Sequence, residues 1–259
     1  MDIWTVAIAL IGGFVAGCVN LLAGNGSAIT LTILTEVMGL PPNMANGTNR
    51  IGVLANSIFG IAAFAQKGRR DLTGTSRFIV TTIAGGFVGI YLATIVDDAQ
   101  FKTFFKYMMI VMLMVVLFKP DRWIRQAEVT YRIPSWIAIP VYFAIGVYGG
   151  FIQMGMGIFF LVVTVFIARY DVIKANFAKM IIVVTFTVFS LFMFSAAGYL
   201  HWQFGLLLAV GQGLGAWVMG IYAARNPRAG LIAYYMLLIG MILAVIKLFE
   251  LHRFLFGSS

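Results

Sequence analysis

The feature that most constrains this chain is a succession of apolar runs separated by very short polar breaks. The runs cover residues 3–22, 27–39, 44–66, 77–96, 101–118, 135–154, 157–168, 174–197, 203–223 and 230–250. A helix of about 20 apolar residues spans the hydrocarbon core of a bilayer. With 61% hydrophobic and only 10% charged residues, the chain is too apolar for a water-soluble globule. We therefore expect an all-α polytopic membrane protein with about 8–10 membrane segments.

The order of the runs repeats along the chain. The polar segment 119–134 separates a first repeat, 1–118, from a second repeat, 135–256. Each half opens with a long run, a glycine-containing break and a short run, and three long runs follow. Sliding the chain by about 130 residues also places Asn46 over Asn176. This shared order indicates an internal duplication.

Positive charges indicate how the two repeats are oriented. Lys and Arg gather in four loops, near 67–77, 119–132, 169–174 and 225–228. Loops rich in Lys and Arg remain in the cytoplasm, so we assign the net charge of +9 to membrane topology rather than to nucleic-acid binding. In this assignment 44–66 runs inward and its counterpart 174–197 runs outward. The sequence thus predicts two inverted repeats, each a broken-helix hairpin plus three transmembrane helices, joined by a cytoplasmic linker.

Metal and redox chemistry have little support in the sequence. Cys18 is the only cysteine, which excludes a disulfide framework and a thiolate metal cluster. His201 and His252 lie far apart and near the ends of runs. Since no nucleophile–base pair is recognisable, we expect neither a cofactor nor a metal, and no enzymatic activity.

The two glycine-containing breaks are the first candidates for a binding site. The first reads NLLAGNGSAITL and the second FIQMGMGIFF. Glycines allow a sharp turn, and the start of the following short helix presents unpaired N–H groups to an anion. The ordinary alternative is that these glycines serve close packing of membrane helices.

The helices after the breaks supply further polar residues. Arg50 and Lys179 lie one to two turns inside their helices, and an intramembrane cation is a functional hypothesis by default. The alternative is that both side chains snorkel to the membrane surface. An anionic substrate would compensate the buried positive charge. The candidate substrate-binding residues are Asn20, Asn25, Gly26, Ser27, Asn46, Thr48, Asn49, Arg50, Gln153, Gly155, Gly157, Asn176 and Lys179.

Three other features of the sequence have interpretations outside the binding site. Glu36 could carry a coupled proton, although it lies near the end of its short run, where water reaches it. The pairs Gly85/Gly89 and Gly211/Gly215 are spaced for close contact between helices rather than for binding.

The chain resembles the TauE/SafE sulfite exporter family, also called the toluenesulfonate uptake permease (TSUP) family. The likeness rests on GGFVAGCVNLLAGNGSAITLTILTEVMGLPPNMANGTNR in the first half and on GVYGGFIQMGMG and GYLHWQFG in the second. It implies a secondary transporter that exports sulfite, a sulfonate or a related organosulfur anion across the bacterial inner membrane by alternating access. An uncoupled anion channel, and a non-transport assembly factor or enzyme, remain the alternatives. Besides the anion, membrane lipid, a coupled proton and a second copy of the chain are the partners considered, and nucleic acid is not.

Overall fold

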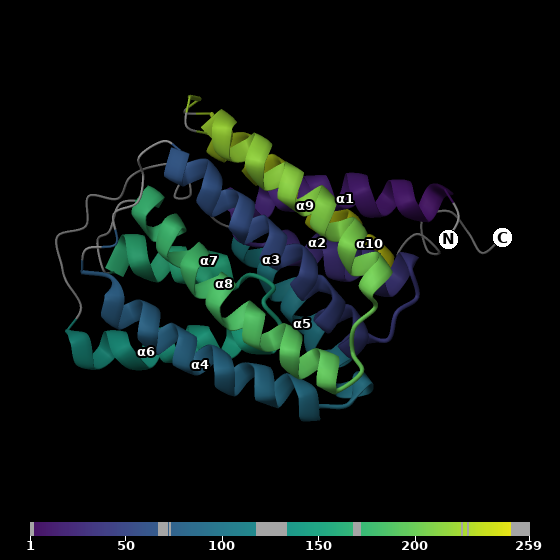
Figure 1. Cartoon of the computed structure of the whole chain (residues 1–259), viewed down its shortest axis with the longest axis horizontal. Coiled ribbons are helices and arrows are strands. Elements are labelled where there is room, and N and C mark those ends of the chain that lie inside the picture. The colour runs from purple at the N-terminus through teal and green to yellow at the C-terminus, as the bar shows by residue number, and fades with distance from the viewer. Residues whose placement is uncertain are drawn as a thin grey trace.

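The computed structural model describes residues 3–66, 72, 74–117, 134–167, 172–223, 225–226 and 228–249. Helices are the only regular secondary structure in these ranges (Figure 1). Their bounds are α1 Ile3–Leu22, α2 Gly26–Thr32, η1 Ile33–Val37, α3 Pro42–Gln66, α4 Ser76–Ile95, α5 Asp98–Leu117, α6 Ser135–Phe151, α7 Met156–Val162, η3 Val163–Ile167, α8 Val172–Ala196, α9 Trp202–Ala223 and α10 Ala229–Leu248. Each expected run ends within three residues of an observed helix end. The expected linker 119–134 lies, apart from Pro134, outside the described residues.

Six of these helices are long and apolar enough to cross a membrane, namely α1, α4, α5, α8, α9 and α10. This confirms an all-α, multi-pass membrane protein. α3 has 25 residues but is not among the six, because polar residues such as Asn46, Asn49, Arg50 and Asn56 lower its hydropathy. The most polar long helix of the described part of the chain is therefore the one that carries more candidate site residues than any other helix.

The helices follow the same order in both halves. The first runs α1, α2, η1, α3, α4, α5, and the second runs α6, α7, η3, α8, α9, α10. α2 and α7 have 7 residues each, and α3 and α8 have 25 each. Both short helices continue directly into a five-residue π-helical turn, η1 or η3, which the sequence did not predict.

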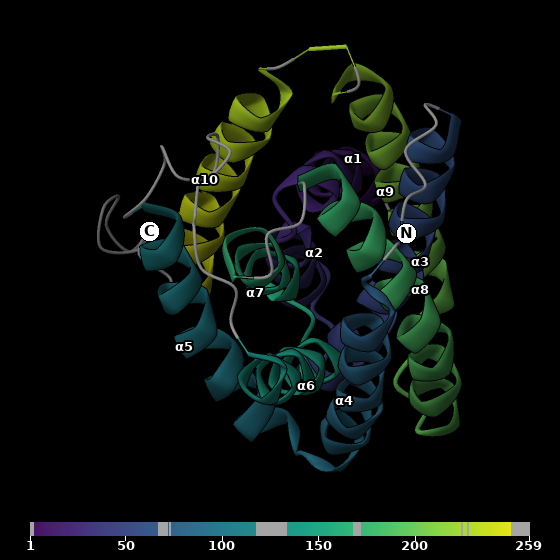
Figure 2. The same cartoon turned by 90° about the vertical axis from the view of Figure 1, so that its left-hand side faces the viewer.

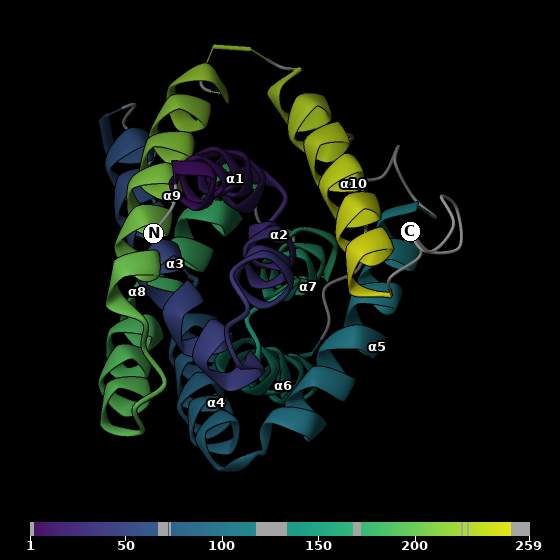
Figure 3. The ribbon, with the colours of Figure 1, turned by 90° about the vertical axis from the view of Figure 1, so that its right-hand side faces the viewer.

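Seen along the long axis of the molecule, the broken helices lie in the middle. Figures 2 and 3 show α1, α2, α7 and α6 end-on, with α3, α4, α8 and α9 on one side and α5 and α10 on the other. In Figure 1, α3 ends and α4, α6 and α8 begin at the left-hand side of the molecule, whereas α1 begins at the right-hand side. The helix ends next to the basic loops thus lie at one end of the molecule.

Glycines allow α4 to pack closely on α6 and α9 to pack closely on α1. A Cβ added to Gly85 or Gly89 of α4 would overlap the carbonyl oxygens of Phe143 or Val147 in α6. A Cβ added to Gly215 of α9 would likewise overlap the carbonyl of Phe14 in α1, and one on Gly211 would meet that of Leu10. The expectation that these glycine pairs serve helix packing is confirmed.

Candidate functional site

The two glycine-containing breaks meet at the centre of the molecule. A Cβ added to Gly24 would lie 2.6 Å from the Cα of Gly157, and one added to Gly157 would lie 2.5 Å from the Cα of Gly24. Gly24 also has a φ of +75°, which side chains rarely tolerate. Only glycine fits both positions, so the backbones of the two hairpin tips touch.

Arg50 reaches from α3 to the end of α6. It is fully buried, and its two terminal nitrogens donate hydrogen bonds to five oxygens. Those acceptors are the carbonyls of Gly149 (3.1 Å), Gly150 (2.7 Å) and Phe151 (3.3 Å), the side-chain oxygen of Gln153 (2.8 Å) and that of Asn46 (3.4 Å). The last carbonyls of a helix carry partial negative charge, which a cation stabilises. Arg50 therefore caps the C-terminus of α6, which belongs to the other half of the chain.

Lys179, in the second half, binds the C-terminal carbonyls of α1 in the first half. Its Nζ donates to the carbonyls of Asn20 and Leu21, each at 3.1 Å, and to Oδ1 of Asn176 at 2.8 Å. The side chain is 5% exposed and reaches from α8 to the end of α1. Snorkelling is therefore wrong for both cations, because each points inward and binds helix-terminal carbonyls. Every hydrogen-bond acceptor named for Arg50 and Lys179 is a neutral oxygen.

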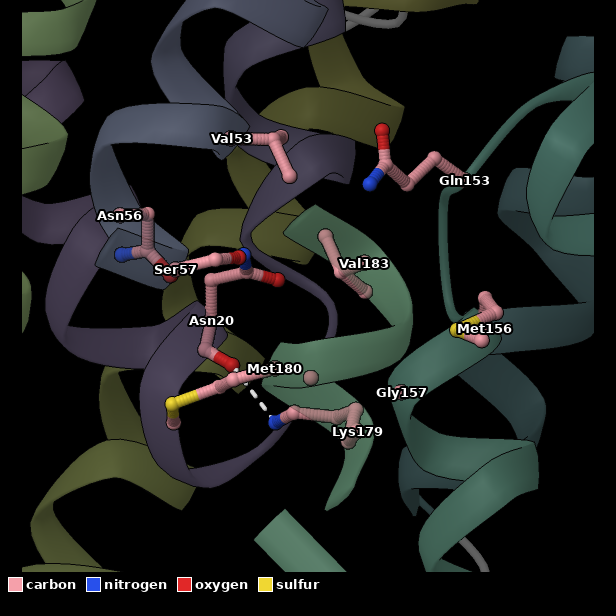
Figure 4. A pocket seen from close by; sticks show the side chains of 11 residues that line it. Asn20, Val53, Asn56, Ser57, Gln153, Met156, Gly157, Lys179, Met180 and Val183 are labelled. Atoms are coloured by element: carbon pink, nitrogen blue, oxygen red, sulfur yellow. Dashed lines mark hydrogen bonds between the residues drawn. The ribbon is translucent and has the colours of Figure 1, made fainter. Parts of the chain in front are cut away.

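A small cavity lies beside the two hairpin tips (Figure 4). Its volume is ≈ 20 Å³, which is room for about one water molecule. It is lined by Asn20, Gly24, Val53, Asn56, Ser57, Gln153, Met156, Gly157, Lys179, Met180 and Val183. The lining thus comes from both halves and combines a cation, three amides and a hydroxyl with apolar side chains.

Four of the predicted site residues, Asn20, Gln153, Gly157 and Lys179, line this cavity. Sequence reasoning missed Asn56 and Ser57, although two adjacent polar residues inside an apolar run are a visible signal. The remaining lining residues could not be predicted from the sequence, because only helix register and packing bring them to the cavity. Those residues are Val53, Met156, Met180 and Val183 together with Gly24, which had been placed in the break but not in the site.

Asn56 ties the first half of the site together. Its Nδ2 donates to the carbonyl oxygens of Gly17 (2.9 Å) and Gln212 (3.2 Å), and its Oδ1 accepts from Nδ2 of Asn20 (3.1 Å). Oδ1 of Asn20 in turn accepts from the backbone N–H of Gly26 at 3.3 Å. This chain of bonds fixes the break between α1 and α2 to α3 and α9.

The other predicted residues support the site without lining the cavity. Asn46 and Asn176 hold the cations, and Nδ2 of Asn46 also donates to the carbonyl of Phe151 at 2.8 Å. Oδ1 of Asn49 accepts from the hydroxyl of Thr30 at 2.6 Å, which joins α3 to α2.

Three further predicted residues face other neighbours. Thr48 accepts from the backbone N–H of His201, and Nδ2 of Asn25 lies 3.3 Å from Sδ of Met241 in α10. Gly155, which precedes α7, packs against Met112 in α5.

Several buried polar atoms of the predicted set have no hydrogen-bond partner in the protein. They are the donors Nε of Arg50, Nδ2 of Asn49 and Nε2 of Gln153, together with Oδ1 of Asn25 and the hydroxyl of Ser27. An unsatisfied buried polar atom costs about 1–3 kcal/mol, so such atoms commonly mark a place where water or a ligand binds. Four of the five, including the hydroxyl, can donate a hydrogen bond, and donors suit an acceptor-rich ligand.

Glu36 lies apart from this centre. It belongs to η1 and lines a separate pocket of ≈ 100 Å³ with Thr35, Leu40, Pro42 and Lys102, among others. Within the described ranges, no group of three or more His, Cys, Asp or Glu side chains is placed to hold a metal ion.

Comparison with known proteins gives the family. The model of the family described as "Sulfite exporter TauE/SafE" matches residues 9–248, which is nearly the whole chain. The chain belongs to this family. Among relatives of this TauE/SafE protein, "Probable membrane transporter protein ORF9" of Sinorhizobium sp is 28% identical over 242 residues, covering 93% of this chain and 91% of that protein.

Two further relatives carry similar names. A "Probable membrane transporter protein" of Haemophilus influenzae is 26% identical over 213 residues, with 82% of each chain covered. "Probable membrane transporter protein YfcA" of Escherichia coli K12 is 24% identical over 242 residues, covering 92% of this chain and 87% of that protein. No solved structure matches this TauE/SafE chain significantly. The family description and the relatives' names indicate a membrane transporter rather than an enzyme.

Proposed function

We propose that this TauE/SafE protein is a secondary transporter that exports a small sulfur-containing anion, such as sulfite or a sulfonate, across the bacterial inner membrane. The observation that supports an anionic substrate is the pair of buried cations, Arg50 and Lys179. Their hydrogen-bond acceptors named above are all neutral. Two desolvated positive charges are costly without a compensating negative charge. A bound oxyanion would provide that charge at the cavity beside Lys179.

The assignment of sulfur and of export depends on the family. The description of the matching model names a sulfite exporter, and the relatives are named as probable membrane transporters. A sulfur oxyanion presents three or more acceptor oxygens, which suits a cavity lined by the unpaired amide nitrogen of Gln153, the hydroxyl of Ser57 and the positive charge of Lys179. Hydrogen bonds in which the acceptor is ionised are shorter and stronger than neutral ones.

The small volume of the cavity supports a carrier over an uncoupled channel. It holds about one water and is therefore smaller than the proposed substrate, so the surrounding helices must move for binding. The same helix order in both halves and the reciprocal contacts α4–α6 and α9–α1 support two inverted repeats around this cavity. In such transporters one repeat moves against the other and exposes the central site to each side in turn.

A binding screen followed by a transport assay tests this proposal. Purified protein is heated with sulfite, sulfate, thiosulfate, taurine or sulfoacetate, and a ligand at 100 times its Kd stabilises the fold by about 2.7 kcal/mol. Proteoliposomes loaded with unlabelled sulfite should then take up labelled sulfite faster than empty ones. If no sulfur anion raises the melting temperature, the substrate class is wrong. If uptake is not accelerated by internal substrate, the protein works as a channel.

A further inference from the structure

The loop between α6 and α7 holds one side chain in an unusual position. Gln153 has a φ of 62°, the only positive φ of a non-glycine residue in the described chain. Such a backbone costs of order 1–3 kcal/mol and is retained where the surroundings impose it. With this backbone conformation, the side chain of Gln153 is 5% exposed and lines the central cavity.

The orientation of the Gln153 amide is fixed by chemistry. Its Oε1 accepts a hydrogen bond of 2.8 Å from Nη1 of Arg50. A guanidinium group has donors only, so the amide oxygen must face Arg50 and the amide nitrogen must face away from it. Figure 4 shows this nitrogen turned toward the space between Val53 and Val183, and it has no hydrogen-bond partner in the protein.

Arg50 itself has little freedom to turn. The same guanidinium donates to the carbonyl oxygens of Gly149 and Gly150 at the end of α6. Because these bonds come from both terminal nitrogens, the plane of the group is set by the helix end. The helix end therefore orients Arg50, and Arg50 orients Gln153.

We propose that Gln153 makes the central cavity selective for oxyanions, and that Arg50 is the residue that positions it. With its oxygen held by Arg50, the amide presents only N–H groups to the cavity. A ligand that offers an acceptor oxygen gains a hydrogen bond there, whereas a ligand that offers a donor meets another donor. Lys179, on the same half as Gln153, supplies the charge. This inference rests on the proposed transport of an anion and assigns the discrimination to one neutral side chain.

Two substitutions of Gln153 separate this role from packing. In Gln153→Glu, a carboxylate still accepts from Arg50 and now forms an ion pair, so the melting temperature should equal or exceed that of the wild type. Its second oxygen replaces the N–H in the cavity, so sulfite binding should weaken on the order of a hundredfold. In Gln153→Met the donor is lost without added charge, and sulfite binding should weaken about tenfold. The matched control is Gln212→Met, which removes a fully buried amide that does not line the cavity and should bind sulfite as the wild type does.

A double-mutant cycle tests the positioning role of Arg50. Arg50→Lys keeps the positive charge but cannot bind both the end of α6 and Gln153, so sulfite affinity should fall about tenfold. Adding Gln153→Met to Arg50→Lys should then cause little further loss, because the amide is no longer oriented. Additive losses would show that Arg50 does not act through Gln153.

The measurements use sulfite, sulfate and nitrate on the purified full chain. The proposal is overturned if Gln153→Glu binds these anions as the wild type does, or if its stability and its binding fall together. It is also overturned if the wild type binds none of the three. If the wild type binds nitrate but no sulfur anion, the sulfur assignment fails, while the role of Gln153 is still decided by the nitrate affinities of the same variants.

Discussion

At the scale of single residues, the site is governed by how a buried cation is satisfied. Burying a charge costs several kcal/mol unless hydrogen bonds replace its hydration. Lys179 replaces it with three oxygens and Arg50 with five. In both cases two or more of these oxygens are helix-terminal carbonyls of the other half, so each cation joins the halves.

Lys179→Gln tests whether charge at this position is needed for the substrate. A glutamine can still donate to Asn20 and Leu21, so we expect the protein to fold. All three N–H donors of Lys179 already bind protein oxygens, so its effect on the anion is that of a nearby positive charge. Loss of this charge should weaken anion binding by about 1.5–3 kcal/mol, or roughly ten- to a hundredfold. Titration of sulfite by isothermal calorimetry measures the change. Lys247→Gln, at the exposed end of α10, is the control and should bind normally; equal affinities in all three proteins would contradict a role for Lys179.

Part of the cavity lining could be predicted from the sequence. Asn20, Gln153 and Lys179 were visible as polar residues beside glycine breaks or inside apolar runs. Asn56 was equally visible, but it lies two turns deeper in α3 than the polar cluster that drew attention. The partners of Arg50 were beyond sequence reasoning, because the end of α6 reaches α3 only through the packing of the two halves.

At the scale of the elements, the breaks were predictable and their geometry was not. Glycines next to short apolar runs indicated broken helices, and the observed bounds agree within three residues. The π-helical turns η1 and η3 have no residue signature in this chain, since Ile33–Val37 and Val163–Ile167 share little beyond apolar and β-branched side chains. A π turn widens the helix by one residue per turn, and such turns are frequent at functional sites.

Gly157→Ala tests the contact between the hairpin tips. The added methyl would lie 2.5 Å from the Cα of Gly24, so either tip must shift. Overpacking of this kind costs about 1–3 kcal/mol of unfolding free energy, and it should also displace the cavity wall and weaken anion binding. Thermal unfolding in detergent measures the first effect and a sulfite titration the second. Gly230→Ala, where an added Cβ meets nothing within 4 Å, is the control; an unchanged melting temperature for Gly157→Ala would mean that the tips do not touch.

At the scale of the whole molecule, helices of each half pack mainly against helices of the other half. α4 packs on α6, α9 packs on α1, Arg50 closes α6 and Lys179 closes α1. Each broken helix is thus fixed mainly by helices of the other half. An arrangement of this kind lets a movement of one half reach the cavity directly, because the cavity wall is made by both.

The membrane orientation of this molecule is a prediction from its basic loops, and it is open to a direct test. With the basic loops in the cytoplasm, the start of α5 faces outward and the start of α10 faces inward. Gln100 and Gly230 are exposed at these two places. In a Cys18→Ser background, whose hydroxyl can replace the bond from Sγ of Cys18 to the carbonyl of Gly215, each position is changed to cysteine.

A membrane-impermeant maleimide added to intact cells should label Gln100→Cys at once and Gly230→Cys only after the cells are permeabilised. This follows because an odd number of crossings must separate the two positions if the repeats are inverted. The Cys18→Ser protein without added cysteine should stay unlabelled under both conditions. Labelling of both positions from the same side would place α5 and α10 in one orientation, and the halves could then not be inverted copies of each other.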